Sequence, residues 1–186
     1  MLMGQSSPVR WTAPDGPWTE PDLHLFPQDG HRYEIVDGSL HVGPPPGPEH
    51  ESVVRALVTL LRGAAPGGWW VCSRLGVEIG GSNVVPDVTV LRPYSSGAVW
   101  TDPDDVALVV EVETPTSRRF DRLLKPALYA DAGIPSYWRV DPDGPTLYVH
   151  RLDQAGGYVL DRTVHGDELV AVDTPYRLRL TPSAWI

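Results

Sequence analysis

The run ALVVEVET at residues 107–114 constrains the fold most, because it is apolar on both faces until carboxylates appear at its far end. Such a continuous apolar run is typical of a strand that is buried on both sides, so we expect a central strand here. The 18 glycines and 20 prolines of the chain are more than a helical bundle would tolerate. The chain is therefore expected to combine strands, turns and short helices.

The remaining patterns predict the elements around this strand. Two alternating runs flank Asp37-Gly38, which is the sequence of a tight two-residue hairpin. Residues 49–62 carry an apolar stripe at helical spacing, and residues 118–133 read as a second helix. The other predicted strands lie at residues 69–80, 84–93, 136–140, 146–152 and 157–164. The order of hairpin, helix, three strands, helix and further strands predicts an α/β fold with a mixed central sheet.

The chain length and termini indicate a simple organisation. At 186 residues the chain fits one domain, which we place at residues 17–186 after a flexible N-terminal arm over residues 1–16. The N-terminus lacks the features of a secretion signal, and no apolar run approaches the roughly 20 residues of a membrane span. A single cysteine, Cys72, excludes an internal disulfide and fits a reducing compartment. We therefore expect a cytoplasmic protein with no membrane partner.

Three carboxylates stand at the ends of predicted strands. Asp87 follows Pro86 near the start of one strand, and Glu111 and Glu113 close residues 107–114. Alternation places Glu111 and Glu113 on the same face of their strand. Taken singly, an Asp beside a Pro is usually a turn residue, and a Glu at a strand end is usually solvated. Together at adjacent strand ends, such carboxylates form a hard-oxygen site that suits Mg²⁺, with Mn²⁺ as a substitute.

Lys125 is the only lysine among 15 basic side chains, and it lies on the helix predicted to pack back near Glu111. An ammonium is a compact point charge, whereas a guanidinium is a rigid fork, so a single lysine in an arginine-rich chain indicates a specific role. It would stabilise a phosphate or orient a water molecule beside the carboxylates. The alternative is a surface lysine that stands here by chance.

Four segments carry a family likeness: YEIVDG, VPDVTVL, LVVEVETPT and YADAGIPSYW. Over residues 33–152 the chain resembles the bacterial restriction-endonuclease-like family of the PD-(D/E)xK phosphodiesterase superfamily. The resemblance implies an αβββαβ core, with a mixed central sheet flanked by helices and extra C-terminal strands, and Mg²⁺-dependent hydrolysis of DNA. By position it also makes Asp87 and Glu111 metal ligands, together with the backbone carbonyl of Val112.

The chain departs from the superfamily pattern in two places. The pattern would put a lysine where this chain has Glu113; in the resembled family that lysine lies on the following helix, where Lys125 stands. Glu113 is then either a further ligand or a neighbour that strengthens the attraction for cations. Pro126 directly follows Lys125, and it is harmless if the helix begins near Leu124 but kinks a helix that begins at Asp121.

Three further residues are candidates for the site. Glu34 matches the family and would face the metal from the first hairpin strand, unless it is a cross-strand polar partner. His50 also matches, and it would approach a phosphate or carry a proton, unless it is an exposed helix-terminus residue. Tyr129 lies one helical turn after Lys125, where packing beneath the lysine is favoured over a hydrogen bond to the site.

The charge distribution favours a local anion site. The net charge of −9 argues against a broad nucleic-acid surface, but residues 116–125 carry four basic side chains against one acidic one. Arg118, Arg119 and Arg122 are therefore candidates for guiding phosphate toward the carboxylates, although such runs are usually solvated helix faces.

These features predict a metal-dependent phosphodiesterase that hydrolyses DNA, in the simplest form an endonuclease. Asp87, Glu111 and Lys125 would be its catalytic residues, assisted by Glu113 or Glu34. The alternative from another class is a catalytically inactive module of the same fold that binds nucleic acid or protein. A third, weaker reading is a phosphodiesterase whose substrate is not duplex DNA. A homodimer would suit an enzyme that cuts both strands of a duplex.

Overall fold

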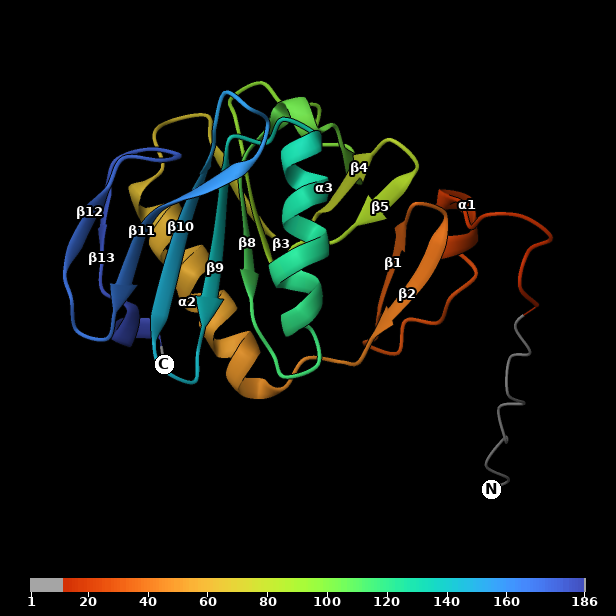
Figure 1. The fold of residues 1–186 in the computed structure, drawn as a ribbon, viewed down its shortest axis with the longest axis horizontal. Coiled ribbons are helices and arrows are strands. Elements are labelled where there is room, and N and C mark those ends of the chain that lie inside the picture. The colour runs from red at the N-terminus through yellow and green to blue at the C-terminus, as the bar shows by residue number, and fades with distance from the viewer. Residues whose placement is uncertain (1–11, 186) are drawn as a thin grey trace.

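The computed structural model of the protein describes residues 12–185 and has a mixed α/β architecture (Figure 1). Its main sheet has six strands in the order β11-β10-β9-β8-β6-β3, and the β8–β9 pair is the parallel one. β8 (Val106–Val112) lies inside this sheet with all seven residues buried, which confirms the predicted central strand. The other five strands are β3 (Trp70–Ser73), β6 (Val88–Leu91), β9 (Ser136–Asp141), β10 (Thr146–Leu152) and β11 (Tyr158–His165).

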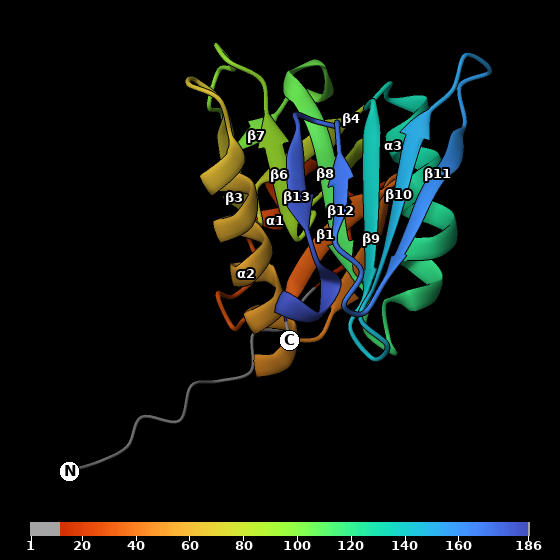
Figure 2. The same cartoon turned by 90° about the vertical axis from the view of Figure 1, so that its left-hand side faces the viewer.

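Two helices lie on opposite faces of the main sheet (Figures 1 and 2). α2 (Pro48–Ala64) places Leu57 and Leu61 in a core shared with the strands beneath it, as its apolar stripe predicts. On the other face, Tyr129 of α3 (Lys125–Asp131) belongs to a second core. The first core is extended by C-terminal elements: β12 (Val170–Val172), β13 (Leu178–Leu180) and the 3-10 helix Pro182–Trp185.

A second sheet of five strands, in the order β2-β1-β5-β4-β7, shares the second core with α3. It contains the predicted hairpin, with Val36 opposite Ser39 across a two-residue turn. Asp37 and Gly38 in that turn have φ angles of 48° and 71°, the left-handed pair that such a turn requires. The strands are β1 (Arg32–Val36), β2 (Ser39–Gly43), β4 (Gly76–Ile79), β5 (Ser82–Val84) and β7 (Trp100–Thr101).

Residues 69–80 and 84–93 do not form the two unbroken strands that we expected. The first range contains both β3 and β4, because Arg74 takes a positive φ of 54° and interrupts the extended chain. The second range contains the end of β5, then Pro86, then β6, since a proline has no N–H to offer to a sheet ladder. These two breaks let the chain alternate between the main sheet and the second sheet.

The second predicted helix contains a π-helix, Phe120–Leu124, which leads directly into α3. In a π turn an N–H bonds to the carbonyl five residues back, as the Lys125 N–H does to Phe120. This wide turn directly precedes Pro126, whose missing N–H would leave an unpaired carbonyl in a regular α-helix. Pro126 is the second residue of α3, and the Asp121 carbonyl five residues before it accepts a hydrogen bond from the Tyr137 hydroxyl, so the helical segment continues through the proline.

The predicted N-terminal arm falls largely outside the described residues, since residues 1–11 are not among them; residues 12–16 contain no helix or strand. A short helix, α1 (Glu20–Leu23), follows with Thr19 as its N-cap. Within residues 12–185, no helix is long and apolar enough to cross a membrane.

Candidate metal and catalytic site

Antiparallel pairing brings Asp87 and Glu111 to the same end of two neighbouring strands. β6 and β8 pair with Val88 opposite Val110, so the residues one step beyond this pair are Asp87 and Glu111. Their side chains are almost fully buried, with 2% and 1% of their surfaces exposed. Unpaired carboxylates are costly in such surroundings, so each must have partners.

Asp87 is held by three donors from different parts of the chain. Its Oδ2 accepts a hydrogen bond from the Val112 N–H at 2.8 Å and lies 3.2 Å from His50 Nε2. Its Oδ1 pairs with the guanidinium of Arg32. Burial opposes ionisation, but Arg32 and the hydrogen bonds outweigh it and hold the pKa of Asp87 well below its usual range. Asp87 is therefore a carboxylate at neutral pH, as a metal ligand must be.

Glu111 has one satisfied and one unsatisfied oxygen. Its Oε1 accepts hydrogen bonds from Lys125 Nζ at 2.9 Å and from the Tyr129 hydroxyl at 2.7 Å. Its Oε2 is buried, has no hydrogen-bond partner among residues 12–185, and lies 3.8 Å from Arg32 Nη1. Burial raises the pKa of Glu111 to about 8, and the Lys125 ammonium opposes that rise. A cation beside Oε2 would further stabilise the ionised form.

Lys125, the only lysine of the chain, is buried with 1% of its surface exposed, so it is not a surface lysine of the helix. Its Nζ lies 2.9 Å from Glu111 Oε1 and 3.1 Å from Glu34 Oε1. Burial disfavours the ammonium, but Glu111 and Glu34 outweigh this and hold the pKa of Lys125 above its usual range. Tyr129 packs in the second core, which was the favoured alternative, and its hydroxyl also donates a hydrogen bond to Glu111 Oε1.

Glu34 and His50 both lie in the site. Glu34 is not merely a cross-strand polar partner, and His50 is not an exposed helix-terminus residue. Glu34 is opposite His41 in the β1–β2 ladder, yet its Oε1 reaches Lys125 and also accepts the Val85 N–H at 2.6 Å. His50, near the start of α2, is buried rather than exposed and its ring contacts Asp87. Val112 contributes its N–H to Asp87, and a role for its carbonyl stays a prediction.

Two residues of the site escaped the sequence interpretation, although periodicity could have found both. Arg32 lies two residues before Glu34 in β1, and strand alternation puts the two side chains on one face. Asp121 lies four residues before Lys125, one helical turn away, and is 2% exposed. Burial raises the pKa of Asp121 to about 6, which Lys125 opposes.

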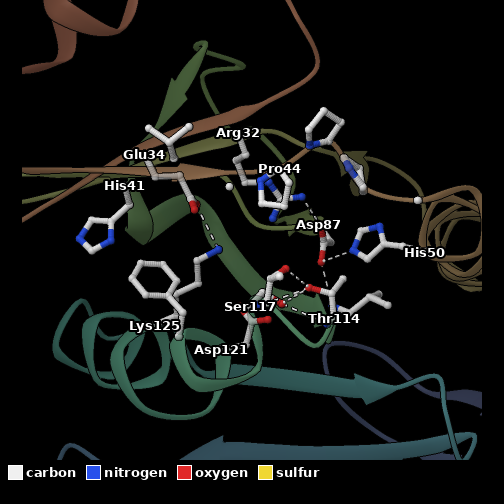
Figure 3. Close-up of a pocket in the computed structure, with 18 residues that line it drawn as sticks. Arg32, Glu34, His41, Pro44, His50, Asp87, Thr114, Ser117, Asp121 and Lys125 are labelled. Atoms are coloured by element: carbon white, nitrogen blue, oxygen red, sulfur yellow. Dashed lines mark hydrogen bonds and ion pairs between the residues drawn. The ribbon is translucent and has the colours of Figure 1, made fainter.

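Most of these side chains line a pocket of about 400 Å³ (Figure 3); Glu111 and Tyr129 are not among its lining residues. The pocket is bounded by the β1–β2 hairpin, the start of α2, the ends of β6 and β8, and the π-helix with the start of α3. Prolines 44–46 and Phe120 give part of its lining an apolar character. Its charged and titratable lining residues are Arg32, Glu34, His41, His50, Asp87, Asp121 and Lys125.

Glu113 belongs to a separate cluster of charges and does not line this pocket. Its carboxylate accepts hydrogen bonds from Arg122 Nε and Nη2 at 2.6 and 2.7 Å, and from Arg139 Nη1 at 2.7 Å. Arg118 Nε lies 3.4 Å away. Burial opposes ionisation, but these guanidinium groups outweigh it and lower the pKa of Glu113. The structure therefore surrounds Glu113 with cations of the chain itself.

The arginines proposed to guide phosphate are mostly engaged in the same cluster. Arg118 also pairs with Asp143 at 3.2 Å, and Arg122 lies 3.8 Å from Asp141. Arg119 is exposed, and within residues 12–185 its side chain makes no hydrogen bond or ion pair. Of this basic run, only Lys125 lines the pocket, and carboxylates neutralise it there.

Replacing Glu113 by Gln is expected to destabilise the protein by about 1–2 kcal/mol, because three guanidinium groups lose their shared carboxylate. The value is modest because Arg122 and Arg118 are about two-fifths exposed and keep contact with water. Urea unfolding of wild type and Glu113→Gln measures it, with exposed Glu78→Gln as the control. Since the folded-state pKa is lowered, the difference should shrink as pH falls below the ordinary glutamate range of about 4. An unchanged stability at neutral pH would show that the cluster is not structural.

Comparison with known proteins identifies the family. Residues 20–183, most of the chain, match the Uma2 family, described as "Putative restriction endonuclease". The chain belongs to the Uma2 family. A crystal structure of a putative nuclease belonging to DUF820 from Anabaena variabilis ATCC 29413 matches with a TM-score of 0.71 and 19% identity, over 91% of this chain and 97% of that chain. No curated protein matches significantly. The restriction-endonuclease-like fold expected from the sequence is thereby confirmed.

The donor set of this Uma2 protein fits one hard divalent cation. Families of this restriction-endonuclease-like type generally use divalent metals. In the site four buried acidic side chains face two cationic side chains, and within residues 12–185 Glu111 Oε2 has no hydrogen-bond partner. The acidic side chains are Glu34, Asp87, Glu111 and Asp121, and the cations are Arg32 and Lys125.

The same site does not form a complete metal cage. Within residues 12–185, no group of three or more His, Cys, Asp or Glu side chains is arranged to hold a metal by itself. Mg²⁺ commonly binds through one or two carboxylates and completes its shell with water and substrate phosphate. Asp87 and Glu111 are the residues that would hold such an ion in this Uma2 protein.

Proposed function

We propose that the protein is a Mg²⁺-dependent nuclease that hydrolyses phosphodiester bonds of DNA. One observation carries the proposal: Asp87 and Glu111 converge, buried, beside a lysine-containing pocket at the ends of β6 and β8. Family membership points to the same class of activity, since the description of the Uma2 family is "Putative restriction endonuclease".

Each side chain has a distinct task in this proposal. Asp87 and Glu111 would hold the metal, which when bound lowers the pKa of a water molecule and stabilises charge on the phosphate. Lys125 places a fixed positive charge at the pocket, where negative charge develops during hydrolysis. His50 and the Val112 N–H orient Asp87, so that one carboxylate conformation is fixed in advance.

The neighbouring groups keep Lys125 in place and charged. Glu34 and Glu111 hold its ammonium from two sides, and Tyr129 fixes Glu111 by a hydrogen bond. Preorganised charges of this kind contribute more in a partly dry site than in water, because no reorientation is needed during the reaction.

The proposal is tested by incubating purified protein with supercoiled plasmid, linear duplex and single-stranded DNA, each in Mg²⁺, Mn²⁺, Ca²⁺ or EDTA. Cleavage is expected in Mg²⁺ and Mn²⁺ and absent in EDTA. Relaxation or linearisation of the plasmid would identify an endonuclease. Cleavage that persists in EDTA would contradict metal dependence. DNA binding without cleavage under every condition would favour the inactive binding module instead.

A further inference from the structure

Arg32 occupies the space between the two proposed metal ligands. Its Nη2 pairs with Asp87 Oδ1 (Figure 3), and its Nη1 lies 3.8 Å from Glu111 Oε2. That Glu111 oxygen has no hydrogen-bond partner within residues 12–185, and it is the oxygen that faces the Arg32 guanidinium. The guanidinium therefore bridges the same two carboxylates that a divalent ion would bridge.

The Arg32 guanidinium and a metal ion cannot contact Asp87 Oδ1 and Glu111 Oε2 at the same time. Mg²⁺ binds carboxylate oxygens at about 2.0–2.1 Å and needs the lone pairs that face it. Arg32 Nη2 already pairs with Asp87 Oδ1, so a lone pair of that oxygen is in use. Arg32 Nη1 occupies the space in front of Glu111 Oε2. The Arg32 guanidinium and a divalent ion also repel each other as like charges. The presence of either one therefore makes binding of the other at this position less favourable.

Arg32 has room to leave without disturbing the core. It is the first residue of β1, its side chain is 15% exposed, and it lines the pocket of about 400 Å³. By contrast, Lys125 is 1% exposed and fixed between Glu34 and Glu111. Of the two cations in the site, Arg32 is the one that a rotation of its side chain can move into the pocket.

We propose that Arg32 is an internal counter-cation that occupies the metal position until a divalent ion displaces it. This inference rests on the proposed function, because it takes Asp87 and Glu111 as the metal ligands. In the metal-free protein Arg32 stabilises the two carboxylates; when metal binds, the guanidinium moves into the pocket. The measured metal affinity of the wild type then contains the cost of breaking the Arg32 contacts.

The test is a calorimetric titration of Mn²⁺ alone into wild type, Arg32→Gln and Arg32→Lys. Arg32→Gln is expected to bind Mn²⁺ at least about tenfold more tightly than wild type, a change of about 1.4 kcal/mol. Arg32→Lys keeps the charge but has no planar fork to span both carboxylates, so its affinity should be intermediate. Arg74→Gln is the matched control, since Arg74 pairs weakly with Glu51 at 3.8 Å away from the pocket, and its affinity should equal that of wild type.

Equal or weaker Mn²⁺ binding by Arg32→Gln, including no binding by either protein, would overturn the inference. Thermal unfolding with and without Mn²⁺ guards against a variant that is merely unstable. Mn²⁺ should raise the midpoint of Arg32→Gln by more than it raises that of wild type, and equal shifts would count against displacement. Cleavage assays separate the two proposals: tighter binding without cleavage rejects the nuclease alone, whereas metal-dependent cleavage by wild type without tighter binding in Arg32→Gln rejects the role of Arg32 alone.

Discussion

Glu111→Gln is expected to lower the rate of Mg²⁺-dependent DNA cleavage by at least about 10²–10³-fold, the range for removing one group that stabilises transition-state charge. Gln has nearly the same shape, and its amide oxygen can still accept the hydrogen bonds that Lys125 and Tyr129 donate. The substitution therefore removes the negative charge while it leaves the packing of β8 intact. Initial rates under single-turnover conditions measure the effect.

The matched control for this variant is Glu113→Gln. Both positions lie at the same end of β8, both are buried and the chemical change is identical. Because Glu113 is held by arginines outside the pocket, its substitution should change cleavage less than about threefold once the protein is folded, well under one decade. Equal losses from the two substitutions would mean that the carboxylate cluster acts through stability and not through chemistry.

Lys125→Arg and Lys125→Met are both expected to lower cleavage by about 10²-fold or more, which answers why this chain keeps one lysine. The ammonium fits between Glu111 and Glu34 with 1% of the side chain exposed, and a guanidinium needs more space than that position has. Lys125→Met leaves two buried carboxylates without their cation, which costs about 3–5 kcal/mol of stability.

Stability and activity must be separated for these variants. Urea unfolding gives the loss of stability, and cleavage is then compared at a temperature where each variant is folded. Arg55→Met is the control for the loss of one positive charge, because Arg55 is exposed on α2 away from the pocket. If Lys125→Arg keeps wild-type stability and cleavage, the position requires only a positive charge and the steric account is wrong.

The elements that the sequence predicted well are those with a strong local signal. Asp37-Gly38 formed the expected two-residue turn because both residues accept a positive φ. β8 was recognisable because burial on both faces removes alternation, and α2 because one face packs on the sheet. The unbroken strand over residues 69–80 was a wrong prediction, since the positive φ of Arg74 has no local sequence signal.

The candidate site was predictable only in part, for a physical reason. Carboxylates at strand ends point to a metal site because few other roles place them there, and Asp87, Glu111 and Lys125 do lie together. Partnerships between distant charges have no such pattern. The arginine cluster around Glu113 depends on Arg139 of β9, 26 residues away in the chain, which only the parallel β8–β9 pairing brings near.

The position of Arg32 could likewise not be predicted from the local sequence. Strand alternation links it to Glu34, but nothing local indicates that its guanidinium lies between Asp87 and Glu111, which come from two other strands. A basic side chain before a hairpin normally reads as a solvated strand end. Its position became informative only when the carboxylates around it were known.

The most direct test of the central claim is the Mg²⁺ dependence of the DNA cleavage rate, measured for wild type and Asp87→Asn side by side. Asn keeps the shape of Asp87 and can still accept the Val112 N–H, but it lacks the charge that would hold the metal. We predict a rate that saturates with Mg²⁺ in wild type, and a rate in Asp87→Asn that stays at the level measured in EDTA or requires far more Mg²⁺. Two superimposable Mg²⁺ curves would contradict the assignment of this site as the nuclease centre.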